Sequence, residues 1–110
     1  MGRGTLPGVQ VTFEAELWRW DARRDDGWTF VTLPAEASQD VRELAAAAPP
    51  RPGFGSVRVT VTIGRTRWGT SVFPDAARGR YVLPVKKAVR RAEGLDVGSV
   101  ATVTVELADL

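Results

Sequence analysis

Apolar and polar residues alternate along three stretches of the chain, and this alternation predicts β-strands. In residues 9–20, apolar side chains occupy the odd-numbered positions up to 17, while Trp18 and Trp20 fall on the otherwise polar face. Residues 57–63 and 101–107 alternate in the same way and are rich in β-branched side chains. A period of two with β-branched residues is typical of strands with one buried face. We therefore expect three half-buried strands at these positions.

Two Leu-Pro pairs, at residues 33–34 and 83–84, each follow a short extended run and precede a helical pattern. Proline pushes the residue before it to extended geometry and suits the first position of a helix. We therefore expect one helix over residues 35–47 and a second that begins at Pro84 and stops at Gly94, a residue suited to the left-handed conformation that ends helices.

The second predicted helix is short and basic. Val85, Val89 and Ala92 recur at helical spacing, with Ala88 beside them, and this recurrence predicts one apolar stripe. The remaining faces carry four cations: Lys86, Lys87, Arg90 and Arg91.

Two turns predict hairpins between the strands. The polar run 21–27 separates the first strand from the extended run that starts at Trp28. Residues 63–66, Ile-Gly-Arg-Thr, place two residues between extended runs with glycine first, which is typical of a type II′ turn. The returning strand is expected to end at Pro74, because proline cannot donate to a strand ladder.

The order strand, Leu-Pro, helix, Gly-Ser-Val, strand occurs over residues 28–63 and again over residues 81–107. Each unit is too short to bury its own apolar face, so the two should pack on one another. Coincidence is the alternative, because the shared motifs are short and common. We interpret the recurrence as an internal duplication in a single β-barrel domain, residues 9–107, with halves 9–64 and 65–107. Residues 1–8 form a disordered lead in this interpretation.

Composition excludes several kinds of site. The chain has 110 residues, enough for one domain with a sizeable core, and 44% of them are hydrophobic. The absence of cysteine and histidine excludes disulfides, thiolate metal sites, a cysteine nucleophile and a histidine base. No apolar run reaches the length of a membrane span, and the first residues lack the apolar core of a signal peptide. We expect a cytoplasmic monomer that needs no cofactor, metal or membrane.

The net charge of +2 is unevenly distributed. Residues 1–50 carry 5 Lys/Arg and 8 Asp/Glu, giving −3, whereas residues 51–110 carry 10 and 5, giving +5. The basic half would meet an anionic partner or be neutralised by the acidic half. The total is too small to indicate a nucleic-acid-binding protein by itself.

Several motifs resemble the bacterial family of Domain of Unknown Function nineteen-oh-five (DUF1905). The resemblance extends over nearly all of residues 9–107 and includes Phe13-x-Ala15-x-Leu17, Phe30-Val31-x-Leu33-Pro34, Phe54-Gly55-Ser56-Val57, Trp68-x-Thr70-Ser71-x-Phe73-Pro74 and Tyr81-x-Leu83-Pro84-Val85-Lys86-x-x-Val89-Arg90-x-Ala92-x-Gly94. The family resembles a double-split β-barrel, the architecture of AbrB/MazE-like DNA-binding domains, and brings no established reaction or catalytic residue. Together with the repeat, the resemblance implies a mainly β fold, a pseudo-twofold double-split β-barrel with two short α-helices.

Two groups of residues are candidate ligand sites. Lys86 and Arg90 lie one helical turn apart and would clamp an anion, or would simply form a solvated basic face. The second group comes from adjoining strands: Trp68, Ser71, Phe73 and Tyr81. These residues would line the mouth of the barrel and hold a small planar or acidic ligand. Alternatively, they would fill the interior, as side chains do in small barrels.

Aromatic and basic surfaces give further candidates. Trp18 and Trp20 would form an interaction surface or a platform on which a ligand stacks. Alternatively, the two indoles would pack on the neighbouring strand and on the first helix. Four arginines of the second half would contact phosphates in a nucleic-acid interface: Arg65, Arg67, Arg78 and Arg80.

Three functions remain open from the sequence. The first is a non-enzymatic binding module for a small anionic ligand or a protein partner. The second is nucleic-acid contact through the basic half, which rests on architectural analogy and is not favoured. The third is an enzyme of unrecorded chemistry with Lys86 or Tyr81 as its proton-transfer group.

Overall fold

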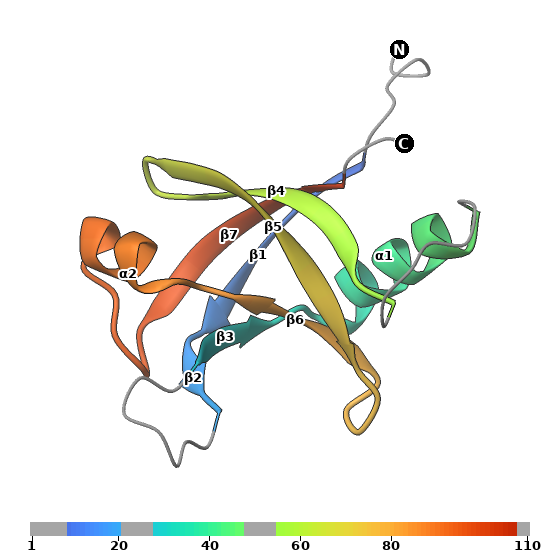
Figure 1. The fold of residues 1–110 in the computed structure, drawn as a ribbon, viewed down its shortest axis with the longest axis horizontal. Coiled ribbons are helices and arrows are strands. Elements are labelled where there is room, and N and C mark those ends of the chain that lie inside the picture. Colours follow the sequence, from blue (N-terminus) through green and yellow to red (C-terminus); the bar gives the residue numbers. More distant parts are fainter. Residues whose placement is uncertain (1–8, 21–27, 48–54, 108–110) are drawn as a thin grey trace.

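The chain forms a curled antiparallel sheet with a helix on either side (Figure 1). The computed structural model describes residues 9–20, 28–47 and 55–107. Within these ranges the strands follow the order β1-β7-β4-β5-β6-β3-β2. Their bounds are β1 Val9–Glu16, β2 Trp18–Arg19, β3 Thr29–Thr32, β4 Val57–Ile63, β5 Thr66–Asp75, β6 Arg80–Pro84 and β7 Val100–Leu107, and those of the helices are α1 Ala35–Ala47 and α2 Lys87–Glu93. The predicted mainly β class with two helices is confirmed.

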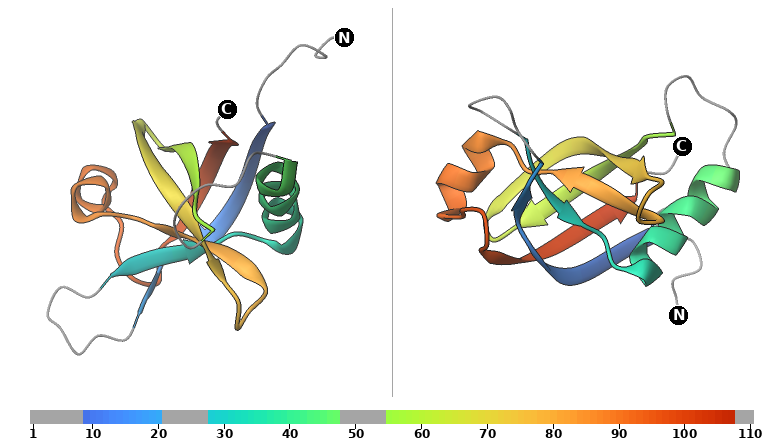
Figure 2. Two further views of the ribbon diagram at one scale, coloured as in Figure 1. Left: turned by 45° about the vertical axis from the view of Figure 1, so that its right-hand side comes forward. Right: turned by 90° about the horizontal axis from the view of Figure 1, so that it is seen from below.

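The curl of the sheet follows from a change of partner at Leu17. β1 pairs along its length with β7, whereas β2 pairs with β3 at the other end of the strand order. Leu17 separates the two strands; its N–H donates to the Ser99 carbonyl, and its own carbonyl accepts from the Gly98 N–H. The strand predicted over residues 9–20 is therefore broken in two, and the strands wrap around a shared interior (Figure 2).

The alternating residues of the long strands form the core. The predicted inward positions of β4 and β7 are all buried: Val57, Val59, Val61, Ile63, Ala101, Val103, Val105 and Leu107. Burial of each valine, isoleucine or leucine side chain contributes about 1.5–3 kcal/mol. The prediction of two half-buried strands here is confirmed, and the first strand agrees, since Phe13 and Ala15 are half-buried while Glu14 and Glu16 are exposed.

The helices lie on opposite sides of the sheet in all views (Figures 1 and 2). α1 covers the predicted residues 35–47 and buries Ala37 and Val41. α2 ends at Gly94 as predicted, with a φ of +66°. Neither helix in the described ranges is long and apolar enough to cross a membrane.

The predicted start of the second helix at Pro84 is wrong. Pro84 is the last residue of β6 and pairs with Phe30. The strand ladder continues past it, because the Val85 N–H donates to the Thr29 carbonyl. The chain therefore stays extended through Lys86, and α2 begins at Lys87.

The predicted apolar stripe of the second helix is only partly confirmed. Val85 and Val89 are buried, whereas Ala88 and Ala92 are exposed. Within the seven residues of α2, Val89 is the buried one.

Pro74 does not end its strand, which is a second correction. β5 continues to Asp75, and Pro74 pairs with Tyr81 of β6. The Tyr81 N–H donates to the Ser38 hydroxyl, and the Tyr81 carbonyl accepts from the Leu33 N–H. Both main-chain groups of Tyr81 thus bond away from β5. Pro74 therefore lies at an antiparallel pair that exchanges no ladder hydrogen bond, and its missing N–H is not needed.

The predicted hairpin at residues 63–66 is confirmed. Ile63 pairs with Thr66, and Gly64 adopts a φ of +60°, as the first central position of a type II′ turn requires. The Glu93 carboxylate accepts from the Arg65 N–H and from the Thr66 hydroxyl, so the turn is tied to the end of α2.

The register between β3 and β6 bears on the predicted duplication. Thr32 pairs with Val82, and each of these residues immediately precedes a Leu-Pro pair. The strands that follow the two helices, β4 and β7, also pair antiparallel. The pairing agrees with two equivalent units, while the pseudo-twofold double-split arrangement stays a prediction. The predicted lead 1–8 and the polar turn 21–27 lie outside the described residues.

Candidate functional site

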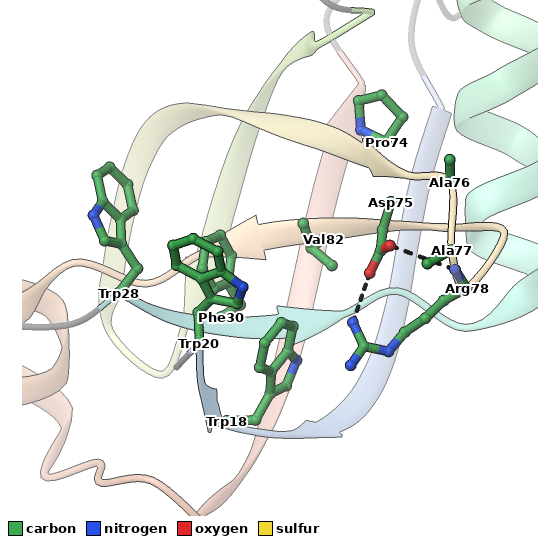
Figure 3. Close-up of a pocket in the computed structure, with 10 residues that line it drawn as sticks. All are labelled: Trp18, Trp20, Trp28, Phe30, Pro74, Asp75, Ala76, Ala77, Arg78 and Val82. Carbon is green, nitrogen blue, oxygen red and sulfur yellow. Dashed lines mark hydrogen bonds and ion pairs between the residues drawn. The ribbon is translucent and has the colours of Figure 1, made fainter. Parts of the chain in front are cut away.

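An open groove of about 540 Å³ lies on the outer face of β2, β3 and β6 (Figure 3). Residues 74–78 at the β5–β6 connection form one side, and Val82 lies between them and a group of aromatic rings. These rings are Trp18, Trp20, Trp28 and Phe30, and we call the whole site the aromatic groove. Its volume is within the range of ligand pockets, about 300–1,000 Å³.

The β2–β3 hairpin places all four rings on one face. Trp18 and Trp20 are two residues apart, as are Trp28 and Phe30, so each pair points to the same side of its strand. Trp18 pairs with Phe30 across the ladder, and the Trp20 N–H donates to the Trp28 carbonyl. The neighbours of Phe30, Thr29 and Val31, are buried, so Phe30 must face outward.

The sequence identified half of this aromatic cluster. The alternation in residues 9–20 singles out Trp18 and Trp20 as an interaction surface; both line the groove, and an interaction there stays a prediction. Trp28 and Phe30 were missed, although the predicted hairpin together with the period of two was a sufficient signal to find them.

Three of the rings stack on one another. The Phe30 centroid lies 5.2 Å from that of Trp18, with 26° between the ring planes, and 6.1 Å from that of Trp28, with 18°. Trp18 Nε1 donates to Thr32 Oγ1 at 2.9 Å. The Arg78 guanidinium lies 4.9 Å from the Trp18 centroid, a cation–π contact. The hydrogen bond, the stacking contact and the cation–π contact together fix the orientation of the Trp18 ring.

The other two indoles are largely open to solvent. Trp20 is 60% exposed and Trp28 61%. Within the described part of the chain, neither indole N–H donates to another residue. The groove therefore presents apolar ring surface together with free hydrogen-bond donors.

Asp75 and Arg78 form the charged end of the groove. Arg78 Nη1 donates to Asp75 Oδ2 at 2.6 Å, and the Arg78 main-chain N–H donates to Asp75 Oδ1 at 3.4 Å. The Arg78 side chain, by this hydrogen bond, lowers the pKa of the Asp75 carboxyl below its ordinary value of 3.8. Asp75 is therefore ionised near neutral pH, and it neutralises Arg78.

The lowered pKa of Asp75 predicts a pH-dependent contribution to stability. The contribution is fully present above about pH 4 and is lost as pH falls through the lower pKa of the folded state. We expect Asp75→Asn to lower the melting temperature at neutral pH, and this difference from the unmodified chain to shrink below about pH 4. Thermal melts followed by circular dichroism at several pH values measure the effect. Asp96→Asn, in an exposed turn, is the control; a difference that stays constant down to about pH 2 would contradict the pairing.

The structure spreads the predicted ligand-site residues over different surfaces. Tyr81 is buried in the core, and Trp68 is half-buried against it. Ser71 and Phe73 alternate with Val72, a core residue, and so lie on the opposite face of β5 from Trp68. None of the four lines the aromatic groove.

Lys86 and Arg90, the candidate anion clamp, do not line the groove. Lys86 is exposed at the start of α2, and Arg90 Nε donates to the Val85 carbonyl. A ligand-binding role for Lys86 and Arg90, or for the four strand residues, stays a prediction. Among the four arginines grouped by sequence, Arg78 lines the groove, while Arg67 pairs with Glu106 at 3.1 Å.

Comparison with protein-family models gives a match that covers most of the chain. A family model described as a domain of unknown function (DUF1905) matches residues 13–105. No curated protein matches the chain. The matched region contains every residue that lines the aromatic groove.

Proposed function

Since this chain belongs to the family described as a domain of unknown function (DUF1905), we propose a function from the groove: the domain is a non-enzymatic binding module. The aromatic groove holds an apolar segment of a protein partner against its exposed indoles.

The exposure of Trp20 and Trp28 carries this proposal. Together they leave most of two large apolar side chains in water, side by side just beyond the paired strands β2 and β3. Tryptophan is enriched among the residues that contribute most to binding at protein interfaces, because it combines a large apolar area with a polar N–H. Contiguous exposed apolar surface of this kind marks interaction sites.

The rest of the groove supports binding because it is already ordered. Trp18 is fixed by its hydrogen bond to Thr32 and by the contacts with Phe30 and Arg78. A partner that contacts this surface does not have to immobilise these side chains on binding. A preformed site of this kind lowers the entropic cost of association.

The chemistry of the groove favours binding over proton transfer. General acid–base catalysis works best when the pKa of the catalytic group lies near the working pH. The pKa of Asp75 is instead lowered by its bond with Arg78, which makes this carboxylate a weak base.

Titration with Nile red, a neutral planar dye, tests whether the groove accepts an apolar occupant. We expect saturable binding of one dye per chain, with Trp20→Ala and Trp28→Ala each weakening it at least about tenfold. Val100→Ala removes exposed apolar surface at a position of β7 that does not line the groove, and it should leave dye affinity unchanged. Equal dye affinity in the tryptophan variants and the unmodified chain would refute the proposal.

A further inference from the structure

The hydrogen-bonding side chains of the aromatic groove are mostly donors. The indole N–H groups of Trp20 and Trp28 have no partner among the described residues, and an indole has no acceptor. Arg78 adds further N–H groups beyond the one that it donates to Asp75. The Asp75 carboxylate, the acceptor on this side, already receives two hydrogen bonds from Arg78. A ligand of the groove should therefore supply hydrogen-bond acceptors and should have few N–H groups of its own, because the groove offers few acceptors for them.

The charge of the lining residues limits which kinds of ligand the groove can bind. Among the described residues that line the groove, Asp75 and Arg78 carry the charges, and at 2.6 Å they neutralise each other. A phosphate-rich ligand would require an excess of positive charge. A site with donors but without net charge is complementary to a neutral ligand whose acceptors are carbonyl groups.

We propose that the aromatic groove binds a proline-rich segment of a partner protein in the polyproline II conformation. This inference rests on the proposed binding function. Proline has no N–H, so such a segment presents carbonyl acceptors and apolar rings without unsatisfied donors. Polyproline II also has no internal hydrogen bonds, so its carbonyls are free to accept from indole N–H groups. Aromatic-lined grooves recognise such segments because the extended helix is already formed before binding.

The spacing of the stacked rings suits this occupant. Trp18 and Trp28 both stack on Phe30, with their centroids 5.2 Å and 6.1 Å from it, so the two indoles lie at most about 11 Å apart, a distance comparable with one turn of polyproline II, about 9 Å. Because the Arg78 guanidinium lies over the Trp18 ring, one proline would contact the edge of Trp18, and a second, three residues away, would contact exposed Trp28. A segment with this repeat is the expected form of the ligand.

Fluorescence anisotropy with a labelled octaproline peptide tests the inference on the full chain. A glycine–serine peptide of equal length is the matched control, and it should not bind. We expect Trp20→Ala and Trp28→Ala to weaken octaproline binding at least about tenfold. Trp20→Phe and Trp28→Phe keep an aromatic ring but delete the N–H, and each should weaken peptide binding about two- to tenfold. Nile red has a single carbonyl and contacts the groove mainly through its planar rings, so the phenylalanine variants should lose less dye affinity than the alanine variants do.

The outcomes separate this inference from the proposed function. Dye binding in the groove without octaproline binding would overturn the inference and leave the binding function standing. Binding of an eight-nucleotide oligothymidylate in preference to octaproline would also overturn it, by identifying a nucleic-acid ligand. Octaproline affinity that is unchanged in the phenylalanine variants would refute the donor argument. Failure of both dye and peptide to bind would remove the function and the inference together.

Discussion

Leu83→Ala is expected to lower the free energy of unfolding by about 2–5 kcal/mol, the range for leucine truncation in a close-packed core. Leu83 has no exposed surface and belongs to β6, the strand that joins β5 to β3. Truncation would leave a cavity at the centre of the curled sheet. The free energy of unfolding of a domain of this size is typically about 5–15 kcal/mol, so the variant would lose a large fraction of its stability.

Leu33→Ala gives the matched test of the predicted duplication. Leu33 precedes the first proline of the two Leu-Pro pairs and is also fully buried. If the two halves are equivalent, its truncation should cost a similar free energy. Urea unfolding followed by circular dichroism measures both variants, and exposed Val97→Ala should change stability by less than about 0.5 kcal/mol. A loss below about 1 kcal/mol for Leu83→Ala would contradict a close-packed core.

The strands and turns were predictable because their signals are local. Val57, Val59, Val61 and Ile63 alternate with polar residues within seven positions, and no distant contact is needed to identify their face. Gly64 likewise determines its turn from the residues next to it. Burial of one strand face then follows from the pattern alone.

The two errors at proline arose because the effect of a missing N–H depends on register. Proline ends a strand only where the pairing needs its donor. Pro74 and Pro84 both lie at pairs that exchange no ladder bonds, and this is decided by their partners Tyr81 and Phe30 on other strands. Residues far apart in the chain determine the outcome, so the local sequence was not sufficient.

The aromatic groove was only partly predictable, because some of its features follow from local alternation and others depend on distant contacts. The outward face of Trp18 and Trp20 follows from alternation in the first strand. The position of Arg78 beside Trp18 depends on how a distant connection packs against β2, which no local pattern contains. The predicted grouping of ligand-site residues at the barrel mouth could have been rejected from the sequence. Trp68 and Phe73 are five residues apart in one strand, so the period of two places them on opposite faces of β5, where they cannot line the same pocket.

The side chain of Ser38 joins α1 to the sheet, and its hydroxyl is expected to be important for stability. Ser38 is buried; its Oγ donates to the Leu33 carbonyl at 3.3 Å and accepts the Tyr81 N–H at 3.0 Å. After Ser38→Ala the Tyr81 N–H would lose this acceptor, and because the N–H points away from β5, Pro74 opposite it cannot replace the hydroxyl. A buried donor without an acceptor costs about 1–3 kcal/mol.

We therefore expect Ser38→Ala to lower the free energy of unfolding by about 1–3 kcal/mol, although alanine is the better helix former by a few tenths of a kcal/mol. Gln39→Ala, at the next and exposed position of α1, should change stability by less than about 0.5 kcal/mol. Urea unfolding gives both values. Hydrogen exchange provides a local measurement, because the Tyr81 amide should exchange faster in the Ser38 variant under conditions in which the fold persists. Unchanged protection of that amide would show that Ser38 is not its hydrogen-bond acceptor, and any loss of stability would then have to come from packing around α1.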